Sequence, residues 1–143
     1  MIDTRTAPYA ALVLRVALGV MFIAHALLKY YVFTLPGTVK FFESIGLPGP
    51  LAYLTFWAEL IGGTLILAGA GSRWAAAALV PLLIGATWAH AGNGWLFSAA
   101  NGGWEYPAFL TIAALAQALL GDGKFAVSSL ASGREFQGAP ALG

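Results

Sequence analysis

The chain has 143 residues, of which 59% are hydrophobic and only 9% are charged, and its net charge at pH 7 is +1. Soluble domains contain roughly 45–50% apolar and about 25% charged residues, so this composition excludes an ordinary soluble domain and predicts one domain covered by lipid. The scattered basic residues give no sign of a nucleic-acid partner, and the absence of cysteine excludes thiol chemistry, so redox chemistry would need a bound cofactor or a quinone.

Four apolar stretches follow one another along the chain, each close to the ~20 residues that a helix needs to cross a bilayer. Helices are expected because lipid offers backbone groups no hydrogen-bond partner, and the stretches lack the alternation of a barrel strand. Arg15 within the first stretch, and the three stretches after it, favour a span over a cleaved leader. We predict an all-α integral membrane protein, an antiparallel bundle of four transmembrane helices at residues 10–28, 51–69, 74–91 and 106–121.

The connections between these spans differ in kind. Residues 69–73, with the sequence GAGSR, predict a tight turn and an antiparallel hairpin of the second and third spans. Residues 38–45 in the long first connection predict a short amphipathic helix, which Phe41 and Phe42 would rest on the membrane surface. We expect one transmembrane domain over residues 1–125, followed by a disordered tail rich in Gly, Ser and Ala over residues 126–143.

Basic residues near the span ends predict the orientation, because cytoplasmic loops carry an excess of Lys and Arg. The end that holds both termini has four such residues against two at the other end: Arg5, Arg73, Lys124 and Arg134 against Lys29 and Lys40. We therefore expect both termini in the cytoplasm and the two long loops on the outer side.

Ionisable side chains inside spans are costly and seldom face lipid, so they mark the interior of the bundle. Arg15, His25 and Lys29 share one face of the first span, and Glu59 lies within the second. At 1.5 Å per residue, antiparallel packing brings most of these groups to the outer end. We predict an outward-opening polar pocket with Arg15, paired to Glu59, as its floor. Its remaining candidate residues are His25, Lys29, His90, Glu105 and Tyr106.

Several segments resemble the DoxX family of membrane proteins. Residues 14–29, LRVALGVMFIAHALLK, resemble its first helix, and residues 42–50, FESIGLPGP, resemble its first loop. Residues 59–63, ELIGG, resemble its second helix, and residues 101–107, NGGWEYP, resemble its third loop. The residues that the resemblance carries over are Arg15, His25, Lys29, Glu59, Asn93, Asn101, Glu105 and Tyr106.

The resemblance extends over about residues 10–125. It implies a four-helix protein of the bacterial inner membrane and a redox setting rather than one reaction. Some DoxX-like proteins are subunits of thiosulfate:quinone oxidoreductase, and others are linked to quinone or oxidative-stress responses.

Each candidate residue also has a structural interpretation. The expected Arg15–Glu59 pair would also hold two helices together, and His25 would also serve as a hydrogen-bonded interior histidine. Glu105 suits the first turn of a helix, and Asn101 with its glycines suits a plain turn. His25 and His90 are the only imidazole ligands for a metal or haem, but their spacing matches no metal-binding motif.

Three functions remain open from the sequence. The first is an oxidoreductase component that binds a quinone, with Glu59 and His25 in proton transfer. The second is a non-catalytic anchor for a soluble oxidoreductase partner, docked through the outer loops. The third, ranked below these, is a small transporter or a metal- or haem-binding protein. The Gly- and Ala-rich third span also suits packing into a homo-oligomer within the bilayer.

Overall fold

The computed structural model describes residues 3–131, and within them the chain is entirely helical, without a strand. The expected all-helical architecture is thereby confirmed for this part of the chain. The helical elements are α1 (Ala7–Leu27), η1 (Leu28–Val32), α2 (Leu35–Ser44), α3 (Pro50–Ala68), α4 (Ser72–His90), η2 (Ala91–Asn93), α5 (Glu105–Leu120) and α6 (Val127–Ala131).

Three helical segments in the described chain are long and apolar enough to cross a membrane, as the composition predicts. They are Ala7–Val32, Pro50–Ala68 and Ser72–Asn93, and the apolar helix α5 is shorter, with 16 residues. The first segment starts earlier than predicted because a proline in the first turn suits a helix start, so Ala7, Pro8 and Tyr9 are already helical.

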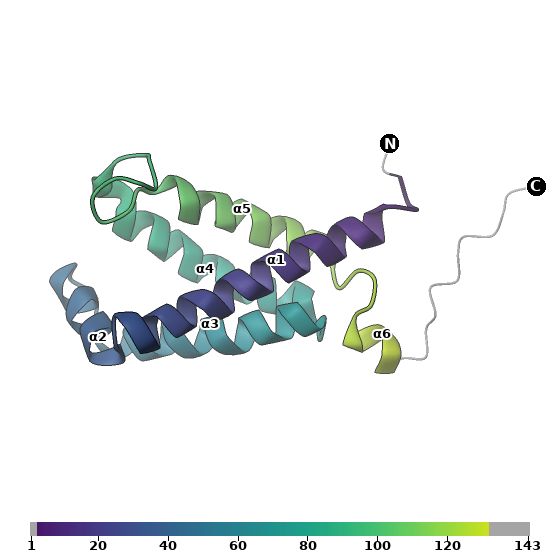
Figure 1. Ribbon diagram of the computed structural model, residues 1–143, viewed down its shortest axis with the longest axis horizontal. Helices are drawn as coiled ribbons and strands as arrows, with labels where there is room; N and C mark the ends of the chain where they lie inside the picture. The colour runs from purple at the N-terminus through teal and green to yellow at the C-terminus, as the bar shows by residue number, and fades with distance from the viewer. Residues whose placement is uncertain (1–2, 132–143) are drawn as a thin grey trace, which may run out of the picture.

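The long helices pack as two pairs, α1 along α3 and α4 along α5, and α3 also contacts α4 (Figure 1). Two glycines let α1 approach α3 closely. A Cβ added to Gly19 would lie 2.7 Å from the Cβ of Leu67, and one added to Gly63 would lie 2.8 Å from the Cβ of Phe22. The core between the pairs is apolar and includes Leu18, Phe22, Ile66, Leu79, Leu83, Leu110 and Ala114.

Glycines form the turn between α3 and α4. Gly69 and Gly71 have φ values of 69° and 71°, a left-handed conformation that side chains with a Cβ rarely adopt. The two helices therefore reverse direction within three residues and form the hairpin that residues 69–73 predict.

The end of the first long segment departs from regular α-helix. Leu28–Val32 form a π-helical turn, a rare form that often marks functional sites, and Lys29 lies within it. Thr34 then caps α2 by accepting a hydrogen bond from the backbone N–H of Gly37 at 3.1 Å. α2 covers most of the predicted loop helix and lies at the end of the molecule opposite the start of α1 (Figure 1).

The start of α1 and the short helix α6 lie at one end of the molecule (Figure 1). Residues 126–131 belong to the segment that we expected to be a disordered tail. Instead, Ala126 is fully buried and Val127–Ala131 form α6. The remainder of that predicted tail, residues 132–143, lies outside the described residues. It includes Arg134, one of the basic residues that we used to predict the orientation.

Candidate functional site

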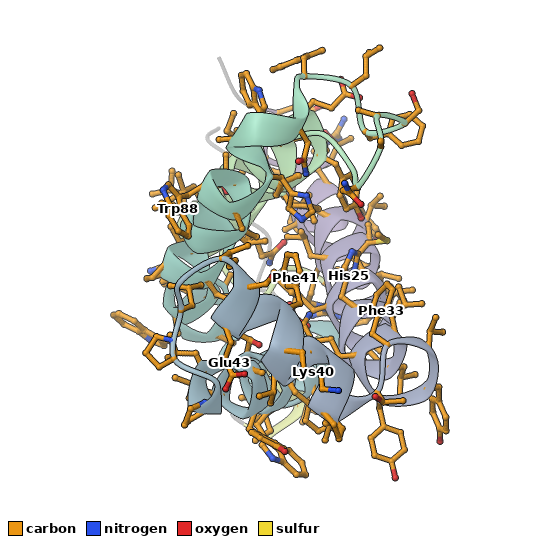
Figure 2. The ribbon with its side chains drawn as sticks, turned by 90° about the vertical axis from the view of Figure 1, so that its left-hand side faces the viewer. His25, Phe33, Lys40, Phe41, Glu43 and Trp88 are labelled. Atoms are coloured by element: carbon orange, nitrogen blue, oxygen red, sulfur yellow. The ribbon has the colours of Figure 1, made fainter. Side chains whose placement is uncertain are left out.

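A cavity of about 640 Å³ lies at the end of the molecule that carries α2, within the size range of ligand pockets. Its walls are mainly apolar and come from α1, α2, α3, α4 and α5. Phe41 and Phe42 of α2 line it, and Figure 2 shows Phe41 on the inner side of α2, whereas Lys40 and Glu43 lie on the outer side. Phe41 and Phe42 therefore line the cavity, and Phe41 is also 45% exposed.

An ion pair between α1 and α3 supplies the charges of the cavity. Lys29 Nζ lies 2.6 Å from Glu59 Oε2, and both residues line the cavity. The side chains are 16% and 6% exposed, respectively. Helical side chains tilt toward the N-terminus of their helix, so Lys29 extends back along α1 into the interior and reaches Glu59.

The predicted pairing of Arg15 with Glu59 is wrong. Arg15 is 3% exposed and donates to the backbone carbonyl oxygens of Asp122 at 2.6 Å and Phe125 at 3.3 Å, at the opposite end of the molecule. The same tilt that turns Lys29 inward turns Arg15 toward the start of α1. Arg15 does not line the cavity, so it is not the floor of the pocket.

His25 and Tyr106 form an aromatic pair in the cavity wall. Their rings stack with centroids 5.8 Å apart and planes inclined by 21°. His25 Nδ1 lies 2.8 Å from the carbonyl oxygen of Met21. The Tyr106 hydroxyl is buried and has no hydrogen-bond partner among the described residues. The first turn of α5 thus places an unpaired hydroxyl beside an imidazole.

His90 also lines the cavity, and it fastens the loop between α4 and α5. His90 Nδ1 lies 3.1 Å from the carbonyl oxygens of both Asn101 and Gly102. Asn93 donates its side-chain amide to the Gly102 carbonyl at 2.8 Å. Asn101 has a φ of 68°, so it shapes the loop through its backbone.

Three candidate residues stand in this loop rather than in the cavity wall. Glu105 accepts a hydrogen bond from the backbone N–H of Phe97 at 2.8 Å, which closes the loop onto the start of α5. Neither Glu105, Asn93 nor Asn101 is among the residues that line the cavity. Among residues 3–131, the structure thus gathers five of the predicted site residues in the cavity wall: His25, Lys29, Glu59, His90 and Tyr106.

Asp122 is a structural residue that the sequence analysis missed. Its Oδ1 accepts from the backbone N–H and the hydroxyl of Ser72, both at 2.6 Å, and its Oδ2 accepts from the Ser128 hydroxyl at 2.6 Å. Burial alone would raise the pKa of Asp122, but the hydrogen bonds from Ser128 and Ser72 and the charge of Arg15 outweigh it and hold the pKa below its usual value. The sequence signal was a lone acidic residue between two glycines directly after the last apolar stretch.

The described residues hold no group of three or more His, Cys, Asp or Glu side chains close enough to bind a metal ion together. Within residues 3–131, His25 and His90 therefore do not form a metal-binding cluster with a carboxylate.

Comparison with known proteins places these residues in a family context. Residues 10–92 match the DoxX family; the match covers most of α1 and all of α2, α3 and α4, with four of the five predicted site residues in the cavity wall. The chain is also 43% identical over 75 residues to "Putative oxidoreductase CatD" of Bacillus subtilis (strain 168). That match covers 52% of this chain and 54% of the relative, so it spans about half of each protein. No solved structure matches the chain.

Proposed function

This chain belongs to the DoxX family, and from that premise we propose that it is a membrane-embedded oxidoreductase component that binds a quinone in the cavity beside α2. The relative in Bacillus subtilis carries the word oxidoreductase in its name. The cavity is large enough for a small ring and is lined mainly by apolar side chains, with a few polar groups between α1, α3, α4 and α5. Such a lining suits a lipid-soluble ring with polar oxygens.

The observation that carries this proposal is the Tyr106 hydroxyl. It is buried and unpaired among the described residues, in a wall of the cavity. Leaving a buried hydroxyl without a partner costs about 1–3 kcal/mol, and a ligand oxygen in the cavity would remove that cost. The stacked His25 ring fixes the position of the phenol and offers a flat surface beside it.

Proton transfer is assigned to Glu59 and His25. Reduction of a quinone consumes two electrons and two protons. We assign the electrons to a partner oxidoreductase and the protons to the two cavity residues. Lys29 Nζ lies 2.6 Å from Glu59 Oε2 and holds this carboxyl group in the cavity wall, where we assign it the exchange of a proton as the ligand changes state.

We further propose that α5 is a fourth transmembrane helix and that both termini are cytoplasmic, in the bacterial inner membrane. α5 has 16 residues, about 24 Å of helix, and packs along α4. Exposed aromatic side chains near the α2 end suit an outer interfacial belt, and Arg5, Arg73 and Lys124 are near the other end. These exposed aromatic residues include Tyr30, Tyr31, Trp57, Trp88 and Trp95.

Quinone binding is tested on the purified protein in mild detergent. Decylubiquinone is added while the tryptophan fluorescence is recorded, because Trp88 lines the cavity and lies within reach of a bound quencher. Saturable quenching that weakens in Tyr106→Phe and Glu59→Gln supports the proposal. Equal quenching in the wild type and in both variants, or no saturable quenching at all, contradicts it.

A second candidate, a docking subunit for a soluble oxidoreductase, is supported by the loop between α4 and α5. Trp95, Leu96 and Phe97 are 54%, 59% and 69% exposed in that loop. Aromatic residues that stand free of the bundle suit a protein contact. Loss of a co-purifying oxidoreductase in Trp95→Ala and Phe97→Ser, with quinone quenching retained, would support the docking role alone.

A further inference from the structure

The hydrogen-bond partner of His25 determines which of its ring nitrogens carries the proton. Nδ1 lies 2.8 Å from the carbonyl oxygen of Met21, one turn earlier in α1. A carbonyl oxygen only accepts hydrogen bonds, so Nδ1 carries the proton in the neutral ring. Nε2 is then a lone-pair acceptor, and no residue from 3 to 131 donates to it. Since the ring lines the cavity, Nε2 is available to a ligand there.

His90 is fixed in the same way from a different helix. Its Nδ1 faces the carbonyl oxygens of Asn101 and Gly102, each at 3.1 Å. Asn93 holds those carbonyls in place through amide contacts at 3.2 Å and 2.8 Å. The Asn93 amide nitrogen also lies 3.4 Å from His90 Nδ1, so this ring nitrogen faces a donor as well as two acceptors. These contacts fasten the ring to the loop without assigning its proton, and His25 is the cavity histidine with an assigned tautomer.

Glu59 adds a second acceptor to the cavity, because Oε2 is used for Lys29 and Oε1 has no partner among the described residues. Lys29 and Tyr106 supply donors: the ammonium uses one of its three N–H groups on Glu59, and the Tyr106 hydroxyl both donates and accepts. These donors serve the oxygen of a carbonyl and of a hydroxyl alike, whereas the acceptors serve only a ligand that donates.

We infer that the cavity binds the reduced, hydroxyl-bearing form of a quinone in preference to its oxidised form, with His25 as the residue that sets this preference. The inference rests on the quinone site proposed above and specifies the redox state that it favours. A quinol hydroxyl donates to His25 Nε2, whereas a quinone carbonyl brings a second acceptor to it and leaves both unpaired. The preference is therefore a property of hydrogen-bond polarity, not of shape.

The two forms are compared in one binding experiment under anaerobic conditions. Decylubiquinone and decylubiquinol are titrated separately into the full-length protein in detergent, with tryptophan fluorescence as the readout. We expect the quinol to bind about tenfold more tightly. A tenfold preference raises the midpoint potential of the bound two-electron couple by about 30 mV, which a redox titration of the bound ligand measures independently.

Two substitutions at His25 test whether the acceptor at Nε2, rather than the imidazole ring as a whole, sets the preference. In His25→Asn, the amide nitrogen replaces Nδ1 opposite Met21 and nothing replaces Nε2, so the ratio of the two dissociation constants should fall toward one. In His25→Gln, the amide oxygen reaches the position of Nε2, so part of the preference should return. Thr64→Val is the control, because Thr64 is exposed on α3 and bonded to Leu60 within its own helix.

Each outcome is decisive. Tighter binding of the quinol that is lost in His25→Asn, together with ¹⁵N shifts that place the imidazole proton on Nδ1, supports the inference. Equal affinities, tighter binding of the quinone, or protons on Nε2 overturn it while leaving the quinone site intact. Failure of both forms to bind overturns the proposed function and the preference with it.

Discussion

Lys29 Nζ and Glu59 Oε2 lie 2.6 Å apart across the contact between α1 and α3, and both side chains are almost entirely removed from solvent. The pair joins the π-helical turn that ends the first long segment to the middle of α3. It is therefore both a wall of the cavity and a connection between the two helices of one packed pair. Its two roles can be separated by substitution.

Breaking the pair from one side should destabilise the protein strongly. Lys29→Met leaves the Glu59 carboxylate buried without its cation, which typically costs about 3–5 kcal/mol. The double variant Lys29→Met, Glu59→Leu should recover most of that loss, because apolar side chains of similar size often replace a buried pair without penalty. Thermal unfolding in detergent, followed by circular dichroism, gives both values. A single variant as stable as the wild type would contradict a structural role for the pair.

Asp122 should make the stability of the protein depend on pH in the acidic range. Its pKa is lower in the folded protein than in the unfolded chain, where Asp has a value of about 3.9. The stabilisation is therefore complete above about pH 4 and is lost as the pH falls through the lower folded value. Asp122→Asn should unfold at a lower temperature than the wild type at pH 6, and the difference should shrink as the pH falls below 4. A constant difference across this range would argue against an ionised Asp122.

The close contact between α1 and α3 should not tolerate a methyl group. A Cβ on Gly63 meets the Cβ of Phe22 at 2.8 Å and the backbone oxygen of Gly19 at 3.1 Å, whereas a Cβ on Gly85 of α4 meets nothing within 4 Å. Gly63→Ala should therefore lower the unfolding temperature by separating two helices, at a cost of about 1–3 kcal/mol. Gly85→Ala, the matched control, should be neutral or stabilising by up to about 1 kcal/mol. Equal effects of the two substitutions would show that this contact does not hold α1 and α3 together.

The composition and the length of the apolar stretches were sufficient to predict the helical membrane architecture, because the cost of unpaired backbone groups in lipid leaves few alternative structures. The tight turn at Gly69 and Gly71 was also visible, since glycine is the residue that adopts a left-handed conformation without strain. The π-helical turn at Lys29 was not visible, because nothing in its sequence distinguishes it from α-helix.

The site was predicted in part, and the wrong pairing of Arg15 has a physical cause. Depth along each span placed His25, Glu59 and His90 at the same end, and all three line the cavity. Partners were assigned by sequence distance alone, and that neglects the direction in which long side chains leave a helix. Both Lys29 and Arg15 extend toward the start of α1. Lys29 therefore pairs with Glu59, and Arg15 instead donates to the segment after α5.

The role of Arg15 gives the last prediction. Its guanidinium binds the carbonyls of Asp122 and Phe125, so it holds the segment after α5 against the start of α1. Arg15→Met keeps the apolar stem and removes both hydrogen bonds, so this segment should detach while the cavity stays unchanged. Limited proteolysis should then cut after residue 121 faster than in the wild type, and decylubiquinone quenching should be retained. Lys29→Met serves as the comparison, because it alters the cavity and leaves the far end intact. Loss of quenching in Arg15→Met, with proteolysis unchanged, would instead return Arg15 to the pocket, where its sequence position alone had placed it.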